Sequence, residues 1–197
     1  SNRILKEKVF PPRGLIYDTN DQIIVNNFIR QDLVLTPNFI DNHSEYLSFI
    51  SELLDVEKNV LENIFYEKLS EIKPFQSFTL LRNLNDEQLA KLKLNSNKLP
   101  GTEIIPSFSR NILFGESIGS TVGYLGFASR QNILNNPKLR NFNDQQIGLT
   151  GIENEFDEEL RGMPGYRFSE KDVNGNVLEV LDTEPSMKGK NVKLSID

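Results

Sequence analysis

The chain of 197 residues has no cysteine and no tryptophan, and it has only one histidine and two methionines. Without cysteine it can form no disulfide, and it has no thiol nucleophile and no cysteine-based zinc site. No run of about 18 apolar residues is present, and no signal-peptide pattern opens the chain. We also expect no metal site of another kind and no cofactor, because the patterns that resemble metal ligands have simpler explanations given below.

Basic residues are fewer than acidic residues. Lys and Arg total 22 against 28 Asp and Glu, so the formal net charge is -6 and the pI is about 5.0. Binding to nucleic acid or to an anionic membrane surface needs a concentrated basic surface, so neither partner is expected. The shares of hydrophobic residues, 38%, and charged residues, 25%, are those of an ordinary globular protein. We expect one domain or two small ones.

Two motifs lie far apart in the chain. The first reads Arg-Gly-Leu-Ile-Tyr-Asp at residues 13–18, and an apolar run follows at residues 23–25. Both runs are rich in β-forming residues, and the polar residues between them tolerate turn geometry, so this segment predicts a β-hairpin. The second motif begins with Gly151. Ile152, Phe156 and Leu160 recur every four residues after it, which predicts a short helix that Gly162, Pro164 and Gly165 end.

The middle of the chain has a helical period. Apolar residues share one face of a helix near residues 47–54 and again near residues 61–69. A third helix is predicted to begin at Asn85, because Gln88 three residues later completes a capping box. Residues 75–81, between the second and third helices, are apolar and aromatic enough to form a strand.

After residue 100 the pattern is typical of strands again. Strands are predicted at residues 102–105 and 122–125, and a hairpin is predicted to join residues 166–173 to 177–181 across Asn174-Gly175. Residues 128–148 are rich in Asn and Gln and are predicted to form an exposed, mobile connection. The predicted fold class is α+β: a β-rich body formed by residues 1–39 and 100–197, and an inserted helical head lobe formed by residues 40–99.

The order of these motifs resembles the N-terminal region of class B penicillin-binding proteins. The opening motif at residues 13–18, the Val-Gly-Tyr-Leu-Gly stretch at 122–126, the Gly-Ile-Glu helix, the turn at 172–175 and the closing segment at 192–197 all match, in the family's order. The long connection between Gly126 and Gly151 is more similar to the elongation-type protein, penicillin-binding protein 2, than to the division-type protein.

This resemblance implies a function. The chain would be the non-catalytic pedestal of a peptidoglycan D,D-transpeptidase of lateral cell-wall elongation, on the periplasmic side of the bacterial inner membrane. The transpeptidase domain and the membrane anchor would lie outside it, so the fragment itself would not be an enzyme. The implied partners are the pedestal's own transpeptidase domain, an MreC-like scaffold and a RodA-like glycosyltransferase.

The resemblance also implies structural roles for particular residues. It places Arg13, Asp18 and Glu153 in a buried charge network that joins the two ends of the chain. The expected structural motif consists of Arg13, Gly14, Asp18, Gly151, Glu153, Gly162 and Gly165. Apolar candidates for a partner surface are Phe65, Phe75 and Phe78.

Several patterns look catalytic or metal-binding but have simpler explanations. Ser70-Glu71-Ile72-Lys73 fits the S-x-x-K pattern of penicillin-recognising enzymes, but no K-[ST]-G occurs in the chain and Pro74 would end a helix through the pair. Residues 115–119 fit G-x-S-x-G, yet the only histidine, His43, lies upstream rather than downstream. His43 itself is predicted to be an exposed residue in the first turn of a helix. Asp172, Asn174 and Asn176 alternate like calcium ligands, but the spacing predicts a hairpin turn.

Two other functions remain open from the residues alone. One is a stand-alone periplasmic or surface module that binds glycan or peptide and shares only a hairpin with the family. The other is a small hydrolase that uses Ser117 or Ser70.

The acidic residues between 153 and 159 are predicted to form the solvated face of their helix, with Glu153 as the exception.

Overall fold

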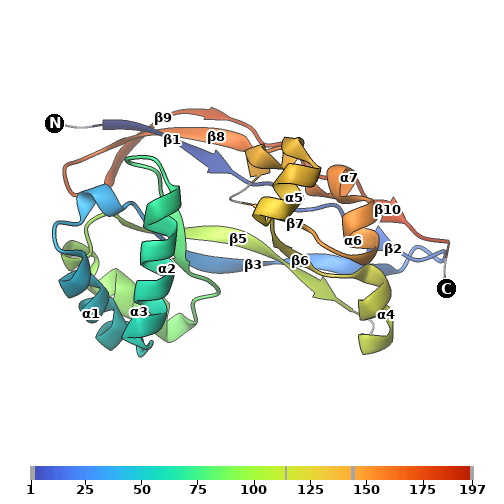
Figure 1. Cartoon of the computed structure of the whole chain (residues 1–197), viewed down its shortest axis with the longest axis horizontal. Helices are drawn as coiled ribbons and strands as arrows, with labels where there is room; N and C mark the ends of the chain where they lie inside the picture. Colours follow the sequence, from blue (N-terminus) through green and yellow to red (C-terminus); the bar gives the residue numbers. More distant parts are fainter. Residues whose placement is uncertain (1–2, 114, 143–144, 196–197) are drawn as a thin grey trace. The chain divides into compact units, whose positions relative to one another are not determined.

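A computed structural model describes residues 3–113, 115–142 and 145–195. It contains helices and several separate sheets, which confirms the predicted α+β class (Figure 1). The chain divides into two compact units. The first takes in the residues up to Lys8, Ile29–Ser107 and Tyr166–Glu184, and the second takes in Val9–Phe28, Phe108–Gly165 and the residues from Pro185 onward. The predicted boundaries at residues 39/40 and 99/100 divide the chain differently, and they stay a prediction.

The helices of the first unit lie together (Figure 1), in the three regions where the sequence predicts helices. They are α1 (His43–Leu54), α2 (Lys58–Glu71) and α3 (Asp86–Leu94), with short 3-10 turns at Pro37–Phe39 and Ser96–Lys98. The Asn42 side chain accepts a hydrogen bond from the Glu45 backbone at the start of α1. The capping box of Asn85 and Gln88 is present at the start of α3.

The helices cover a core built on two strands. β3 (Ile23–Leu35) pairs antiparallel with β4 (Phe78–Leu81), so that Leu35 lies opposite Phe78. β5 (Thr102–Ile112) also pairs with β3. Leu33, Leu47 and Phe65 have no exposed surface in this core. Burying a side chain of this size contributes about 1.5–3 kcal/mol to the free energy of unfolding.

A second sheet of the first unit has the order β1 (Arg3–Val9), β8 (Gly165–Lys171), β9 (Val177–Glu184). β8 and β9 form the predicted hairpin. In its turn, Oδ1 of Asp172 accepts hydrogen bonds from the backbone N–H groups of Asn174 and Asn176, at 2.8 and 2.9 Å. The side-chain amide of Asn176 also donates to Oδ2 of Asp172, at 3.0 Å, and this contact is the largest cause that lowers the pKa of Asp172; the backbone hydrogen bonds add to it. The pattern of possible calcium ligands is therefore a turn, as predicted.

The second unit joins the start of the chain to its end. β2 (Ile16–Tyr17) pairs antiparallel with the beginning of β3, which is the predicted hairpin, and parallel with β10 (Val192–Lys193). Ile16 and Val25 of these strands form an apolar cluster with Leu160, and all three residues are fully buried. The remaining elements are α4 (Gly115–Val122), β6 (Leu125–Phe127), α5 (Arg130–Asn135), a 3-10 segment (Pro137–Phe142), β7 (Gln146–Gly148), α6 (Gly151–Glu155) and α7 (Asp157–Arg161).

Three local predictions are wrong in this unit. Val122 ends helix α4 instead of beginning a strand, and β6 begins at Leu125. The segment 128–148 is not merely an exposed connection, because β7 pairs with β6 and Leu139, Phe142 and Ile147 form a small core. The helix after Gly151 is broken at Phe156, whose side chain is 37% exposed.

Candidate functional site

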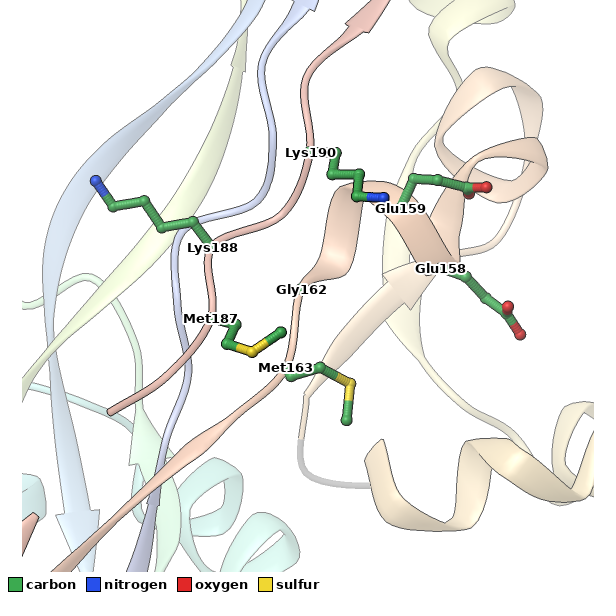
Figure 2. A pocket seen from close by; sticks show the side chains of 7 residues that line it. All are labelled: Glu158, Glu159, Gly162, Met163, Met187, Lys188 and Lys190. Carbon is green, nitrogen blue, oxygen red and sulfur yellow. The ribbon is translucent and has the colours of Figure 1, made fainter. Parts of the chain in front are cut away.

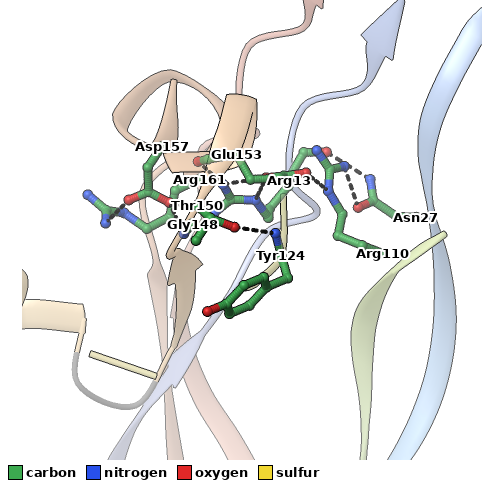
Figure 3. A network of polar contacts seen from close by, with 9 residues as sticks. All are labelled: Arg13, Asn27, Arg110, Tyr124, Gly148, Thr150, Glu153, Asp157 and Arg161. Atoms are coloured by element: carbon green, nitrogen blue, oxygen red, sulfur yellow. Dashed lines mark hydrogen bonds and ion pairs between the residues drawn. The ribbon is translucent and has the colours of Figure 1, made fainter. Parts of the chain in front are cut away.

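Arg13 and Glu153 form a buried ion pair in the second unit (Figure 3). Arg13 donates from Nη2 and Nε to Oε2 of Glu153, at 2.8 and 3.1 Å. Its third nitrogen, Nη1, donates to Oδ1 of Asp157 at 3.0 Å. Arg13 is 7% exposed and Glu153 is 1% exposed. One guanidinium therefore binds two carboxylates away from water, where charge-assisted hydrogen bonds are strong.

Two further arginines extend this pair into a row of alternating charges (Figure 3). Arg110 donates from Nε to Oε1 of Glu153 at 2.7 Å, and Arg161 donates from Nη1 to Oδ2 of Asp157 at 2.5 Å. Each carboxylate thus lies between two guanidinium groups. We call Arg110, Glu153, Arg13, Asp157 and Arg161, in this order, the Arg13 network.

Neutral groups close the two ends of the network. At one end, Nη1 of Arg110 donates to Oδ1 of Asn27 at 3.1 Å, while Nδ2 of Asn27 donates to the carbonyl of Arg13. At the other end, the guanidinium of Arg161 lies 3.7 Å above the centre of the Phe142 ring, a cation–π contact. The resemblance predicts a buried Glu153, whereas Asp157 was expected to be solvated with the other acidic residues of this segment; it begins α7 after the break at Phe156 and is buried.

The glycines of the motif allow the backbone segments around the network to approach closely. The Gly14 N–H donates to the Leu160 carbonyl at 2.8 Å, and a Cβ on Gly14 would lie 1.8 Å from the carbonyl oxygen of Lys190. Gly162 ends α7 with a φ of 68°, where other residues are strained. Gly151 is the first residue of α6, and the buried Gly165 is the first residue of β8.

Asp18 does not join the network among the contacts that the structure describes. Its Oδ1 accepts hydrogen bonds from the backbone N–H groups of Asn20 and Gln22, both at 2.8 Å. The carboxylate therefore stabilises the turn between β2 and β3. Of the three residues that the resemblance places in one network, the structure brings together Arg13 and Glu153 only.

The first unit has a charge network of its own, which the sequence did not indicate. Glu7 and Glu103 each accept hydrogen bonds from both Arg167 and Lys171, at distances between 2.5 and 3.1 Å. Lys171 is only 2% exposed. Burial raises the pKa of Glu7, but the hydrogen bonds and charges of Lys171 and Arg167 outweigh it, so that this pKa is lowered. We call these four residues the Glu7 network.

The three phenylalanines proposed for a partner surface differ in their exposure. Phe65 has no exposed surface and Phe78 is 8% exposed, and both rings pack together in the core of the first unit. They cannot meet a partner unless this core opens. Phe75 is half-buried and lies beside the ring of Phe39, with the Arg3 guanidinium 3.8 Å above it. Only Phe75 is therefore accessible.

The residues of the catalytic look-alikes do not form a site among the described side chains. Helix α2 ends at Glu71, before Lys73, and the Ser70 hydroxyl donates to the Glu67 carbonyl. The side chain of Ser117 lies outside the described residues. His43 begins α1 but is half-buried rather than exposed, because its ring packs 4.8 Å from that of Phe65. The described residues contain no group of three His, Cys, Asp or Glu that could hold a metal ion.

A hollow of about 220 Å³ lies beside the end of α7 (Figure 2). Met163 and Met187 line it and exchange two backbone hydrogen bonds of 2.9 Å. Two acids and two lysines complete its lining with Gly162: Glu158, Glu159, Lys188 and Lys190. Its lining combines charges of both signs and contains no Ser, Thr, Cys or His, so it shows no arrangement typical of a catalytic site. Among the described residues no helix combines the length and apolar character that crossing a membrane requires.

Comparisons with known proteins agree with this arrangement. A family model described as the penicillin-binding protein dimerisation domain matches residues 8–194. Peptidoglycan D,D-transpeptidase MrdA of Haemophilus influenzae is 28% identical over all of this chain, and MrdA of Escherichia coli K12 is 27% identical. In both cases the chain spans 31% of the relative's length.

Solved structures share the fold. The penicillin-binding protein 2 of a complex between that protein and MreC from Helicobacter pylori superposes with a TM-score of 0.67 at 22% identity, covering the whole chain and 37% of that protein. Penicillin-binding protein 2B from Streptococcus pneumoniae strain 5204 gives a TM-score of 0.68 at 22% identity, and the match covers 42% of it. This chain therefore belongs to the penicillin-binding protein dimerisation domain family, as its motifs predicted.

Proposed function

We propose that this chain is the non-catalytic pedestal of a peptidoglycan D,D-transpeptidase of lateral cell-wall elongation. The observation that carries the proposal is the match to MrdA over the entire chain but only 31% of the MrdA sequence. The acyl-transfer chemistry of such a transpeptidase would belong to the remaining part. In keeping with this, the Ser70-x-x-Lys73 pattern lies across a helix end and lacks the contact that a nucleophile and its base need.

The pedestal would hold the catalytic domain at a fixed place on the periplasmic side of the inner membrane. A support needs a rigid base, and the Arg13 network supplies rigidity because five charged side chains hold one another in place within the second unit. Charge-assisted hydrogen bonds between buried groups fix the geometry of the side chains that form them.

The pedestal would also receive partners. We propose an MreC-like scaffold, since the Helicobacter pylori relative was solved in complex with MreC, and a RodA-like glycosyltransferase, which the family resemblance implies. Calorimetry with the periplasmic part of MreC from the same organism tests the first proposal. Saturable binding at about micromolar strength or tighter would support it. The matched control is a protein of the same net charge with a scrambled sequence, and equal heats from both would contradict it.

A fluorescent penicillin tests the non-catalytic assignment. No labelling of the chain is expected, whereas a full-length relative run beside it should label. Labelling that disappears in Ser70→Ala would contradict the assignment, because it would show that this chain carries the acylated serine.

A further inference from the structure

Strand β9 is an outer strand of the β1–β8–β9 sheet (Figure 1). On one side it pairs with β8. On its other side, in the part of the chain that the structure describes, no strand pairs with it and none of its backbone groups bonds to another segment. All eight of its residues are exposed. Unpaired N–H and C=O groups along such an edge can pair with a strand of another chain.

The register of β9 against β8 separates its charged side chains from its valines. Residues directly opposite each other in an antiparallel pair share a face of the sheet, and successive residues of a strand alternate between faces. The three acids of β9 lie opposite every second residue of β8: Glu184 opposite Tyr166, Asp182 opposite Phe168, and Glu179 opposite Glu170. Val180 and Val177 lie opposite residues in between, Ser169 and Lys171. The acids therefore share one face, and the two valines share the other.

Contacts of β8 confirm the two faces. On the acidic face, the Lys6 ammonium lies 3.7 Å from the centre of the Tyr166 ring and 5.1 Å from that of Phe168. On the other face, Arg167 and Lys171 bind the carboxylates of the Glu7 network. Side chains thus alternate regularly along β8, and the register transfers this alternation to β9.

Two β-bulges in β9 keep the acids together. Leu181 and Leu178 have no partner on β8, because the register shifts by one residue at each of them. Asp182 and Glu179 are three positions apart, and in a regular strand they would point to opposite faces. The bulge at Leu181 returns Glu179 to the face of Asp182. A strand whose sequence mixes acidic and apolar residues thereby acquires one acidic face.

The charge of β9 indicates what kind of segment fits beside it. Among the described residues no lysine or arginine forms an ion pair with Glu179, Asp182 or Glu184, and the strand itself contains no basic residue. A second copy that joined through an antiparallel β9 would bring its own acids to the same face, where like charges repel. A segment with Lys or Arg at alternate positions is complementary instead. The half-exposed Val177 and Val180 favour apolar residues at the positions in between.

We propose that β9 is the docking edge for an extended segment of another protein in which basic and apolar residues alternate. The segment adds to the sheet as a fourth strand, with its basic side chains beside the acids of β9 and its apolar side chains beside the valines. Of the devices that blunt an edge, β9 has neither lysine nor proline. Its two bulges limit regular pairing to short stretches, so the docked segment is short. Such an edge would take up this segment whether or not the chain is a pedestal.

Titration with the peptide acetyl-Lys-Val-Lys-Val-Lys-Val-Lys-amide, followed by ¹⁵N–¹H NMR of the 197-residue chain, tests the proposal. We expect saturable shifts of the amides of β8 and β9, with a dissociation constant of about 0.1–1 mM. Two control peptides carry the same side chains. One has its four lysines before its three valines, and the other has N-methyl groups on two consecutive central residues, which removes backbone donors. Each should bind at least about tenfold more weakly.

Three outcomes would overturn the proposal. Absence of saturable shifts in β9 would show that the edge takes up no such segment. Equal binding by either control peptide would show that charge alone attracts the peptide, without strand pairing. Shifts of the β9 amides on raising the concentration of the chain without peptide would show that a second copy occupies the edge.

Two triple variants separate the edge from the net charge of the chain. Glu179→Gln/Asp182→Asn/Glu184→Gln removes the acids of β9 and leaves its backbone edge in place, so it should weaken binding of the alternating peptide about tenfold. Glu52→Gln/Glu57→Gln/Glu67→Gln changes the net charge equally at exposed positions outside β9, and binding should stay nearly the same. An equal loss of affinity in both variants would overturn the proposal.

Discussion

Arg13 and Glu153 lie 140 positions apart in the chain, yet two nitrogens of one side chain bind the same carboxylate oxygen of the other. Their contact joins the first motif of the sequence to the second. Leu160 and Gly14 make the same connection through the backbone, since the Gly14 N–H donates to the Leu160 carbonyl. The two motifs are therefore parts of one structural site, although the sequence separates them by most of its length.

Removing one side of the ion pair should be costly. Arg13→Ala leaves each of the two buried carboxylates with one guanidinium in place of two, so we expect a loss of about 3–5 kcal/mol in the free energy of unfolding. In a chain of this size the melting temperature should fall by about 6 °C or more. Arg140→Ala, at an exposed position, is the control. A fall of less than about 2 °C in calorimetric melting would contradict a structural role for the pair.

The close approach of the backbone at Gly14 can be tested by changing Gly14 and Gly119 separately to alanine. Gly14→Ala places a Cβ 1.8 Å from a backbone oxygen. The backbone must shift to make room, so the free energy of unfolding should fall by about 4 kcal/mol or more. Gly119 lies in helix α4, and outside its own helix no described atom lies within 4 Å of an added Cβ, so its change to alanine should be neutral or stabilise by about 0.5–1 kcal/mol. Urea unfolding of both variants measures the difference, and similar midpoints would disprove this packing.

The partly accessible Phe75 can be compared with the buried Phe65. Phe65→Ala creates a cavity in the helical core and should destabilise by about 3–5 kcal/mol. Phe75→Ala should cost about 1 kcal/mol or less, because the side chain is only half-buried. If Phe75 contacts a partner, its substitution will weaken binding while the melting temperature falls by no more than about 4 °C. Equal melting temperatures of the two variants would show that this core is not packed as described.

The Glu7 network predicts a dependence of stability on pH. Since the pKa of Glu7 is lowered from 4.5 in the folded state, its ionised form contributes stability above about pH 4.5, and this contribution is lost as the pH falls through the folded pKa. The difference in free energy of unfolding between the native chain and Glu7→Gln should therefore shrink between about pH 5 and pH 3. Denaturant titrations at each pH measure it.

Glu184→Gln, at an exposed position of β9, is the control for this pH series. It should show almost the same stability as the native chain at every pH. A constant difference between the native chain and Glu7→Gln over the whole range would contradict a lowered pKa for Glu7.

Local signals in the sequence predicted local structure. The capping box at Asn85 located a helix start, and Asn174-Gly175 located a hairpin, because in both cases the determining contacts lie within a few residues. Propensity failed for α4. Its glycine and β-branched residues disfavour a helix, but Val122 is buried against the core of the second unit, and packing outweighs propensity.

The charged residues show where a single sequence is insufficient. Arg13 and Glu153 were paired from a family resemblance, not from spacing. Nothing near Lys171 indicates that Glu7 lies beside it, since the contact depends on which strands of the β1–β8–β9 sheet are neighbours. Asp157 lies four residues after Glu153 and so on the same face of a regular helix, but it belongs to a run of acidic residues, which favours a solvated position. Only the fold shows that Arg13 and Arg161 meet its carboxylate.

The parallel pairing of β10 with β2 has a consequence for the order in which the protein folds as it is synthesised. The core beneath α1, α2 and α3 uses residues 33–104, so it can form early from one continuous stretch. Ile16 and Val25 are covered in part by Val192 and Leu194, which leave the ribosome long after them. The apolar hairpin near the start of the chain must therefore stay uncovered until residues 192–194 have been synthesised, and throughout that interval it is the segment most in need of a chaperone.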